Sequence, residues 1–108
     1  MKQLGAEHVI VIPELWPRDE HGQVVGAREF TAEEWTHFLA GHDEIGRRLL
    51  EEYGMHQQFH SHAETQVGSH LEIQRLLEGT NPEYLNLCLD TGHYAYYWGD
   101  CFSLIREY

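Results

Sequence analysis

Basic residues, cysteines and long apolar runs are all scarce in this chain. Seven Lys and Arg stand against 18 Asp and Glu among 108 residues, which gives a formal net charge of −11. Such a surface repels phosphate backbones, so we expect no nucleic-acid partner. No apolar run approaches the roughly 18 residues that a transmembrane helix requires. Residues 1–12 are too polar for a secretory signal. We therefore expect a cytoplasmic protein with no membrane partner.

Histidine is frequent in this chain, whereas cysteine is rare. Cys88 and Cys101 form neither a CxxC pair nor a dense framework, which predicts reduced thiols. Nine histidines indicate either a metal site or a set of surface imidazoles. The content of 42% hydrophobic and 23% charged residues is typical of one small domain, and we find no linker within residues 1–108.

The first half of the chain predicts one strand and one long helix. Residues 8–12 form a β-branched run that Pro13 closes, followed by an irregular loop. Thr31 and Glu34 have capping-box spacing, apolar residues then recur at helical intervals, and Gly54 predicts the helix end.

The second half predicts two further strands, each followed by a helical segment. Residues 55–59 are compatible with a strand, and residues 69–79 form a helix with a second capping box and a terminal glycine. Residues 84–89 are apolar enough for a strand buried on both faces, with Cys88 an inert thiol inside it. Residues 100–108 begin a helix without a stop signal, so we interpret the C-terminus as truncated.

Alternating strands and helices predict an α/β fold with about three consecutive parallel βα units and right-handed crossovers. Parallel strands need both faces covered and both edges paired, which three such units do not provide. A non-catalytic domain that pairs its exposed edges with a second copy is therefore an alternative to an enzyme segment.

Polar side chains follow each predicted strand. Glu14 follows the first, His60 and His62 the second, and Asp90 and His93 the third. Reactive groups of parallel α/β sheets lie at the carboxyl ends of strands. An aspartate directly after an apolar strand is costly to bury unless it is paired or metal-bound, and a histidine three residues later can turn back into the same cavity.

Each of these residues also has a structural interpretation. Asp90 could cap the Asp-Thr-Gly turn, the two histidines could line the surface, and Glu14 alone favours a structural role. The aromatic residues 94–98 are more typical of core or rim packing than of a sugar platform. The remaining histidines have no metal-ligand spacing and are predicted to be solvated or incidental: His8, His21, His37, His42, His56 and His70.

Two motifs resemble a known family. Residues 59–67, FHSHAETQV, and residues 87–93, LCLDTGH, resemble the xylose-isomerase-like TIM-barrel superfamily of sugar phosphate isomerases and epimerases. Within it, they are most similar to the inosose dehydratase group, and the resemblance covers nearly the whole chain. It implies a single partial (β/α)8 TIM-barrel domain, roughly strands 4 to 6, because the complete barrel needs roughly 250 residues.

The resemblance also implies a chemistry. It would be a sugar or cyclitol isomerase, epimerase or dehydratase, a lyase, that acts through an enediolate-type intermediate with manganese or cobalt, or alternatively magnesium or zinc. Asp90 matches a metal ligand, and His60 lies where another ligand or a catalytic group is expected. His93 would contact substrate or move a proton, and His62 would contact substrate. Glu14, from its place after the first strand, is a further candidate for substrate contact.

The chain departs from the family at two places. Relatives often carry a glutamate ligand on the strand where this chain has residues 57–59, and close relatives usually have glutamate in place of Gly68. Two later ligands, a His and a Glu, would lie beyond Tyr108. The alternatives therefore include a truncated half-barrel that self-associates or only binds metal. A third hypothesis is that the chain belongs to the phosphodiester-cleaving endonuclease branch of the superfamily. The net charge of −11 argues against this, because it disfavours DNA binding.

Overall fold

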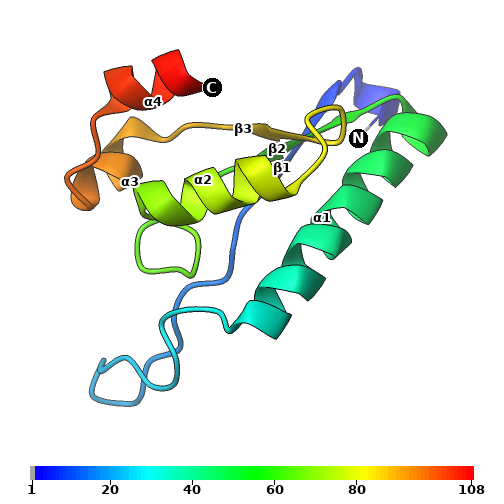
Figure 1. The fold of residues 1–108 in the computed structure, drawn as a ribbon. Helices are drawn as coiled ribbons and strands as arrows, with labels where there is room; N and C mark the ends of the chain where they lie inside the picture. Colours follow the sequence, from blue (N-terminus) through cyan, green and yellow to red (C-terminus); the bar gives the residue numbers. More distant parts are fainter. Residues whose placement is uncertain (1) are drawn as a thin grey trace.

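A computed structural model describes residues 2–108 and contains one three-stranded parallel sheet in the order β1-β2-β3 (Figure 1). The strands are β1 (His8–Val11), β2 (His56–Phe59) and β3 (Leu85–Leu87). Phe59, at the end of β2, pairs with Val11 on one side and Leu87 on the other. The predicted α/β class is confirmed, and the parallel sheet with intervening helices is consistent with part of a TIM barrel.

Helices connect the strands and follow the last one. Figure 1 shows the long α1 beside the sheet, α2 in front of it in this view, and the two short helices near the end of the chain. The helices are α1 (Ala32–Tyr53), α2 (His70–Gly79), α3 (Thr91–Tyr96) and α4 (Cys101–Glu107), and a 3-10 turn, η1, spans Lys2–Leu4. Within residues 2–108, no helix is both long enough and apolar enough to cross a membrane.

The predicted ends of α1 are confirmed. The Thr31 hydroxyl accepts from the backbone N–H of Glu34 at 3.2 Å, while the Glu34 carboxylate accepts from the Thr31 N–H at 2.7 Å. Gly54 ends the helix in the left-handed region at φ +62°, which glycine adopts without steric cost. The second capping box is also present, since the Glu72 carboxylate accepts from the Ser69 N–H at 2.8 Å.

Two predictions about the second half were wrong. The strand predicted over residues 84–89 is shorter and is not buried on both faces, because Asn86 is exposed and β3 is an edge strand of this sheet. The short helix α3 was not anticipated at all. Its first turn is closed by a side-chain cap, since Asp90 Oδ1 accepts from the His93 N–H at 2.9 Å.

A polar side chain lies at the centre of the α1–sheet interface. Gln57 on β2 is completely buried, and its Nε2 donates to the carbonyl oxygens of His42 at 2.9 Å and Tyr84 at 3.2 Å. Its Oε1 lies 2.8 Å from His42 Nδ1. His42 was predicted to be solvated or incidental, and this was wrong because its ring completes the hydrogen bonds of a buried amide.

The apolar core packs around this interface and continues toward the carboxyl ends of the strands. Phe59, Ile73 and Leu76 are fully buried. Tyr94 of α3 and Leu104 of α4 belong to the same cluster, so the C-terminal helices are packed against the sheet. The full cluster is Trp35, Phe59, Val67, Ile73, Leu76, Leu85, Tyr94 and Leu104. Both cysteines are free thiols, and Cys88 is half-buried, not fully buried.

Candidate functional site

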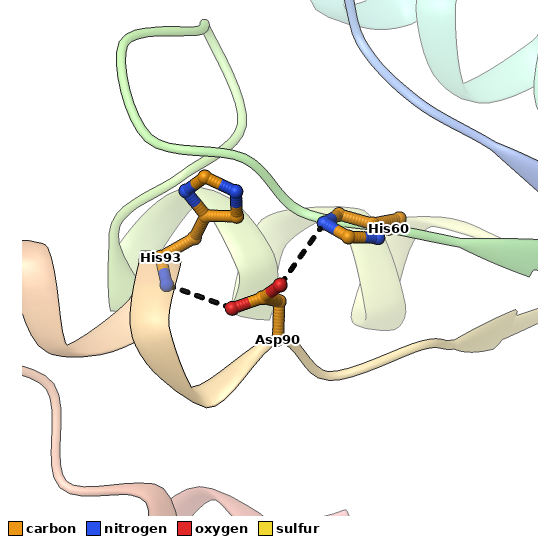
Figure 2. A group of neighbouring side chains, drawn as sticks. All are labelled: His60, Asp90 and His93. Carbon is orange, nitrogen blue, oxygen red and sulfur yellow. Dashed lines mark hydrogen bonds and ion pairs between the residues drawn. The ribbon is translucent and has the colours of Figure 1, made fainter.

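Three of the predicted residues meet at the carboxyl ends of β2 and β3 (Figure 2). His60 directly follows β2, Asp90 is the N-cap of α3, and His93 lies in the first turn of α3. One potential ligand atom from each residue lies within 4.8 Å of the others. Parallel topology causes this meeting, since it brings the ends of neighbouring strands to one edge of the sheet.

His60 has a buried nitrogen without a hydrogen-bond partner. Its Nε2 lies 3.6 Å from Asp90 Oδ2, which is too long for a hydrogen bond. Buried polar atoms nearly always have a partner, so a nitrogen that faces a carboxylate without bonding to it has the geometry of two ligands around a shared cation. The donor set therefore fits a divalent metal ion.

Asp90 is both a helix cap and a candidate ligand. Its Oδ1 accepts from the His93 backbone N–H, whereas its Oδ2 faces His60. This backbone hydrogen bond is the main reason why the pKa of the Asp90 carboxyl is held below its usual range, with nearby His93 and His60 adding to the effect. The two interpretations of Asp90 from the sequence are therefore compatible, because each oxygen has its own partner.

A third imidazole, that of His62, stacks beside the cluster. Its ring centroid lies 3.6 Å from that of His93 and 5.9 Å from that of His60. His62 Nδ1 lies 2.7 Å from the carbonyl oxygen of Ala63, which can only accept, so Nδ1 carries the hydrogen. In the neutral form of the ring, this places the lone pair on Nε2.

Glu14 is not a member of this cluster. It is exposed and lines a separate hollow of about 420 Å³ on the loop after β1. The other lining residues are mainly apolar: Pro13, Leu15, Pro17, Phe30, Phe38 and Gln66. Substrate contact by Glu14 stays a prediction, as does contact by His62.

The backbone around Gly68 accounts for one departure from the family pattern. A Cβ atom at this position would lie 2.7 Å from the carbonyl oxygen of His62 and 2.8 Å from the Tyr97 ring. A glutamate there requires the loop to move. On β2, the buried Gln57 is occupied by hydrogen bonds to His42 and Tyr84, so it is not free to act as a ligand.

Residues 94–98 and His70 form contacts that the sequence did not reveal. Tyr94 is buried, and its hydroxyl lies 2.7 Å from His70 Nδ1, while His70 Nε2 lies 3.7 Å from a Glu107 oxygen. The prediction that His70 is incidental was therefore wrong. Trp98 is 96% exposed, so the aromatic stripe divides between core and surface. No local spacing signals these contacts, because each joins distant segments.

The fold and the cluster together define a parallel α/β segment with imidazole and carboxylate groups gathered at the carboxyl ends of its strands. Comparison with known proteins gives a more specific similarity. The chain is 35% identical over 79 residues to an inosose dehydratase of Bacillus velezensis, which covers 73% of this chain and 26% of that protein. An inosose dehydratase of Halalkalibacterium halodurans is 30% identical over 95 residues, or 86% and 31% of the two chains.

A Bacillus cereus inosose dehydratase is 34% identical over the same share of this chain as the first relative. These similarities confirm the resemblance to the inosose dehydratase group. No family model matches the chain. The chain spans between a quarter and a third of the length of the curated relatives it matches.

Proposed function

We propose that this chain contributes a divalent-metal site to an enzyme that acts on a sugar or cyclitol. Among isomerase, epimerase and dehydratase activities we favour dehydration, a lyase reaction, because the similar proteins are named inosose dehydratases. The observation that carries the proposal is the buried, unpartnered Nε2 of His60 opposite the Asp90 carboxylate.

His60, Asp90 and His93 are the residues that would hold the metal. Two imidazoles and one carboxylate suit manganese, cobalt or zinc better than magnesium, which prefers oxygen ligands alone. When bound, such an ion supplies Lewis-acid polarisation of a carbonyl and its neighbouring hydroxyl. Three ligands leave further coordination positions for substrate, water or other side chains.

The chain's own groups provide for binding and proton movement. The lone pair on His62 Nε2 can accept a hydrogen bond from a substrate hydroxyl, since Nδ1 is fixed by the Ala63 carbonyl. The reaction class is removal of a proton next to a carbonyl, for which the lone pair of His62 Nε2 would be the acceptor, and this gives an enediolate-type intermediate. Return of that proton elsewhere gives isomerisation or epimerisation, whereas its transfer to a departing β-hydroxyl, which leaves as water, gives dehydration.

The Asp90→Asn variant tests the metal site against a matched control. Asp100 also caps a short helix, α4, through the Phe102 N–H and the Ser103 hydroxyl, so Asp100→Asn removes a capping charge without touching the cluster. Calorimetric titration with Mn²⁺ and Co²⁺ should show strong loss of binding in Asp90→Asn and none in Asp100→Asn. Unchanged binding in Asp90→Asn would overturn the ligand assignment.

Activity needs a separate assay. The chain is incubated with an inosose and Mn²⁺ or Co²⁺, and mass spectrometry detects a product that has lost one water molecule. Turnover that depends on the metal and on Asp90 supports dehydration. Metal binding without turnover restricts the role of this chain to the metal site.

Self-association without catalysis is the second candidate. Beside the edge strand β3 lies an apolar hollow of about 420 Å³, lined by residues of α2, β3 and α4 that include Leu77, Leu87 and Ile105. An unpaired strand edge next to apolar surface favours pairing with another chain. Sedimentation velocity should then show a dimer that dissociates on dilution, whereas a concentration-independent monomer contradicts this candidate.

A further inference from the structure

Glu64 adopts a backbone conformation that a side chain rarely accepts. Its φ is +61°, and within residues 2–108 only Trp98 is another non-glycine residue with a positive φ. Glu64 lies in the loop between β2 and α2, two residues after His62. A left-handed glutamate persists only when its surroundings hold it there, and such positions concentrate at functional sites.

The surroundings of Glu64 come from two other segments of the chain. In the loop after β1, the Trp16 backbone N–H donates to the Glu64 carbonyl oxygen at 2.8 Å, and the Arg18 guanidinium lies 2.8 Å from the Glu64 carboxylate. From α3 and its C-terminal end, the Tyr97 hydroxyl accepts from the Glu64 N–H at 3.0 Å, and the Tyr96 hydroxyl donates to the carboxylate at 3.5 Å.

These contacts join the two segments that carry the histidines of the candidate site. His60 and His62 precede Glu64 in the β2–α2 loop, and His93 lies on α3. We propose that Glu64 is a positioning residue that holds the His60–His62 segment against α3 and thereby sets the geometry of the metal ligands. This inference rests on the proposed metal site.

An ordinary surface ion pair would not explain this arrangement. The Arg18 and Glu64 side chains are 41% and 38% exposed, and a single pair of this kind contributes little stability. Glu64, however, uses its N–H, its carbonyl oxygen and its carboxylate at once, in a disfavoured conformation. The hydrogen bond with Arg18 also holds the pKa of the Glu64 carboxyl below its usual range, which favours the charged form that pairs with Arg18.

Two substitutions separate the side chain from the backbone. Glu64→Gln keeps the size of the side chain and removes its charge, while Glu64→Gly removes the side chain and accepts the positive φ without strain. Glu52→Gln is the matched control, because Glu52 pairs with Arg48 at 2.8 Å on α1, away from the site. If a Glu64 variant fails to fold, Tyr97→Phe tests the same role, because it removes only the hydroxyl that accepts a hydrogen bond from the Glu64 N–H.

Co²⁺ binding to the full 108-residue chain is the first measurement, because the visible spectrum of Co²⁺ reports ligand geometry. Substitutions behind metal ligands typically reduce affinity about 10- to 100-fold. We expect a loss of about tenfold with a changed spectrum for both Glu64 variants, a smaller loss in the same direction for Tyr97→Phe, and neither effect for Glu52→Gln. Wild-type affinity and spectrum in the Glu64 variants would overturn the inference.

A metal-free measurement separates this inference from the proposed function. The rings of His62 and His93 lie 3.6 Å apart at an angle of 36°, so their ring currents shift one another's NMR signals, and the imidazole carbon-bound proton resonances report their relative position. If the wild-type chain binds no Co²⁺, the proposed metal site fails. The positioning role is then decided by these signals, which should move in the Glu64 variants and stay fixed in Glu52→Gln. Unchanged His62 and His93 signals would refute it.

Discussion

Histidines lie at both ends of the sheet, but their surroundings differ. At the amino ends of the strands, His8 and His56 are paired in register, with ring centroids 5.9 Å apart and both side chains exposed. At the carboxyl ends, His60 and His93 have ring centroids 5.6 Å apart, a similar spacing. Here, however, the rings are half-buried, and one potential ligand atom of each lies within 4.8 Å of an Asp90 carboxylate oxygen. Spacing between imidazoles is therefore not what distinguishes a candidate site.

The difference comes from the chain segments around each end of the sheet. The segment that follows β3 brings a helix-capping aspartate beside the half-buried His60, whereas the His8 and His56 side chains at the amino ends are exposed. Partial burial removes water that would otherwise satisfy His60 Nε2. A carboxylate nearby then supplies the charge that a cation requires. The comparison predicts that substitutions at the carboxyl ends lower stability and metal binding more than matched changes elsewhere.

The largest expected effect is on packing beneath the carboxyl-end cluster. Phe59→Ala removes a fully buried ring directly before His60 and should lower the free energy of unfolding by about 3–5 kcal/mol. Ile10→Ala, on β1 with 56% of the residue exposed, should cost much less. Urea unfolding followed by circular dichroism measures both. Equal losses would show that the packing around the two residues does not differ as described.

Gly68 tests how closely the loop packs at the carboxyl ends. Gly68→Ala places a Cβ against the His62 carbonyl and the Tyr97 ring and should cost about 1–3 kcal/mol. In α1, by contrast, a Cβ at Gly41 meets no atom within 4 Å, so Gly41→Ala should stabilise the helix by about 0.5–1 kcal/mol. Thermal unfolding of the two variants should therefore give shifts of opposite sign.

Metal binding compares the two groups of histidines directly. His60→Ala should weaken Co²⁺ binding at least about tenfold, because it removes a ligand from the cluster. His56→Ala removes an exposed ring of the amino-end pair and should leave this binding unchanged. Calorimetry on both variants provides the answer, and equal effects would mean that the Co²⁺ site includes the amino ends of the strands.

The smallest effect concerns pH. Hydrogen bonds from Ser103 and the Phe102 N–H hold the pKa of Asp100 below its usual range. A lowered pKa stabilises the fold above the unfolded value of about 3.9, and this stabilisation is lost as pH falls through the folded value. Wild-type stability should therefore decrease more than that of Asp100→Asn between neutral pH and acid. If the urea midpoints of the wild type and of Asp100→Asn fall by the same amount between the two pH values, the role of the cap is contradicted.

Local patterns were enough to predict most of the fold. The capping boxes at Thr31 and Ser69, and the left-handed Gly54, mark helix ends through contacts within a few residues, so sequence spacing reveals them. The grouping of His60, Asp90 and His93 could also be predicted from the sequence, because parallel topology places the carboxyl ends of neighbouring strands at one edge of the sheet.

Long-range contacts were not predictable in the same way. His42 bonds to Gln57, His70 to Tyr94 and Glu64 to Arg18, each across 15 or more residues. Nothing in the neighbourhood of these residues in the sequence indicates the partner, since the partner is brought in only by tertiary packing. For the same reason the extent of β3 was overestimated: apolar composition indicates a strand but not which neighbours cover it.

The buried amide of Gln57 also determines how the strands align. Its hydrogen bonds reach α1 through His42 and the start of β3 through Tyr84. A slip of β2 by one residue would turn this side chain to the other face of the sheet and break its hydrogen bonds to two carbonyl groups and an imidazole. Apolar contacts tolerate small displacements, whereas these directional bonds do not. Gln57 therefore fixes the register of β2, in which Phe59 pairs with Val11 on one side and Leu87 on the other where the strands end.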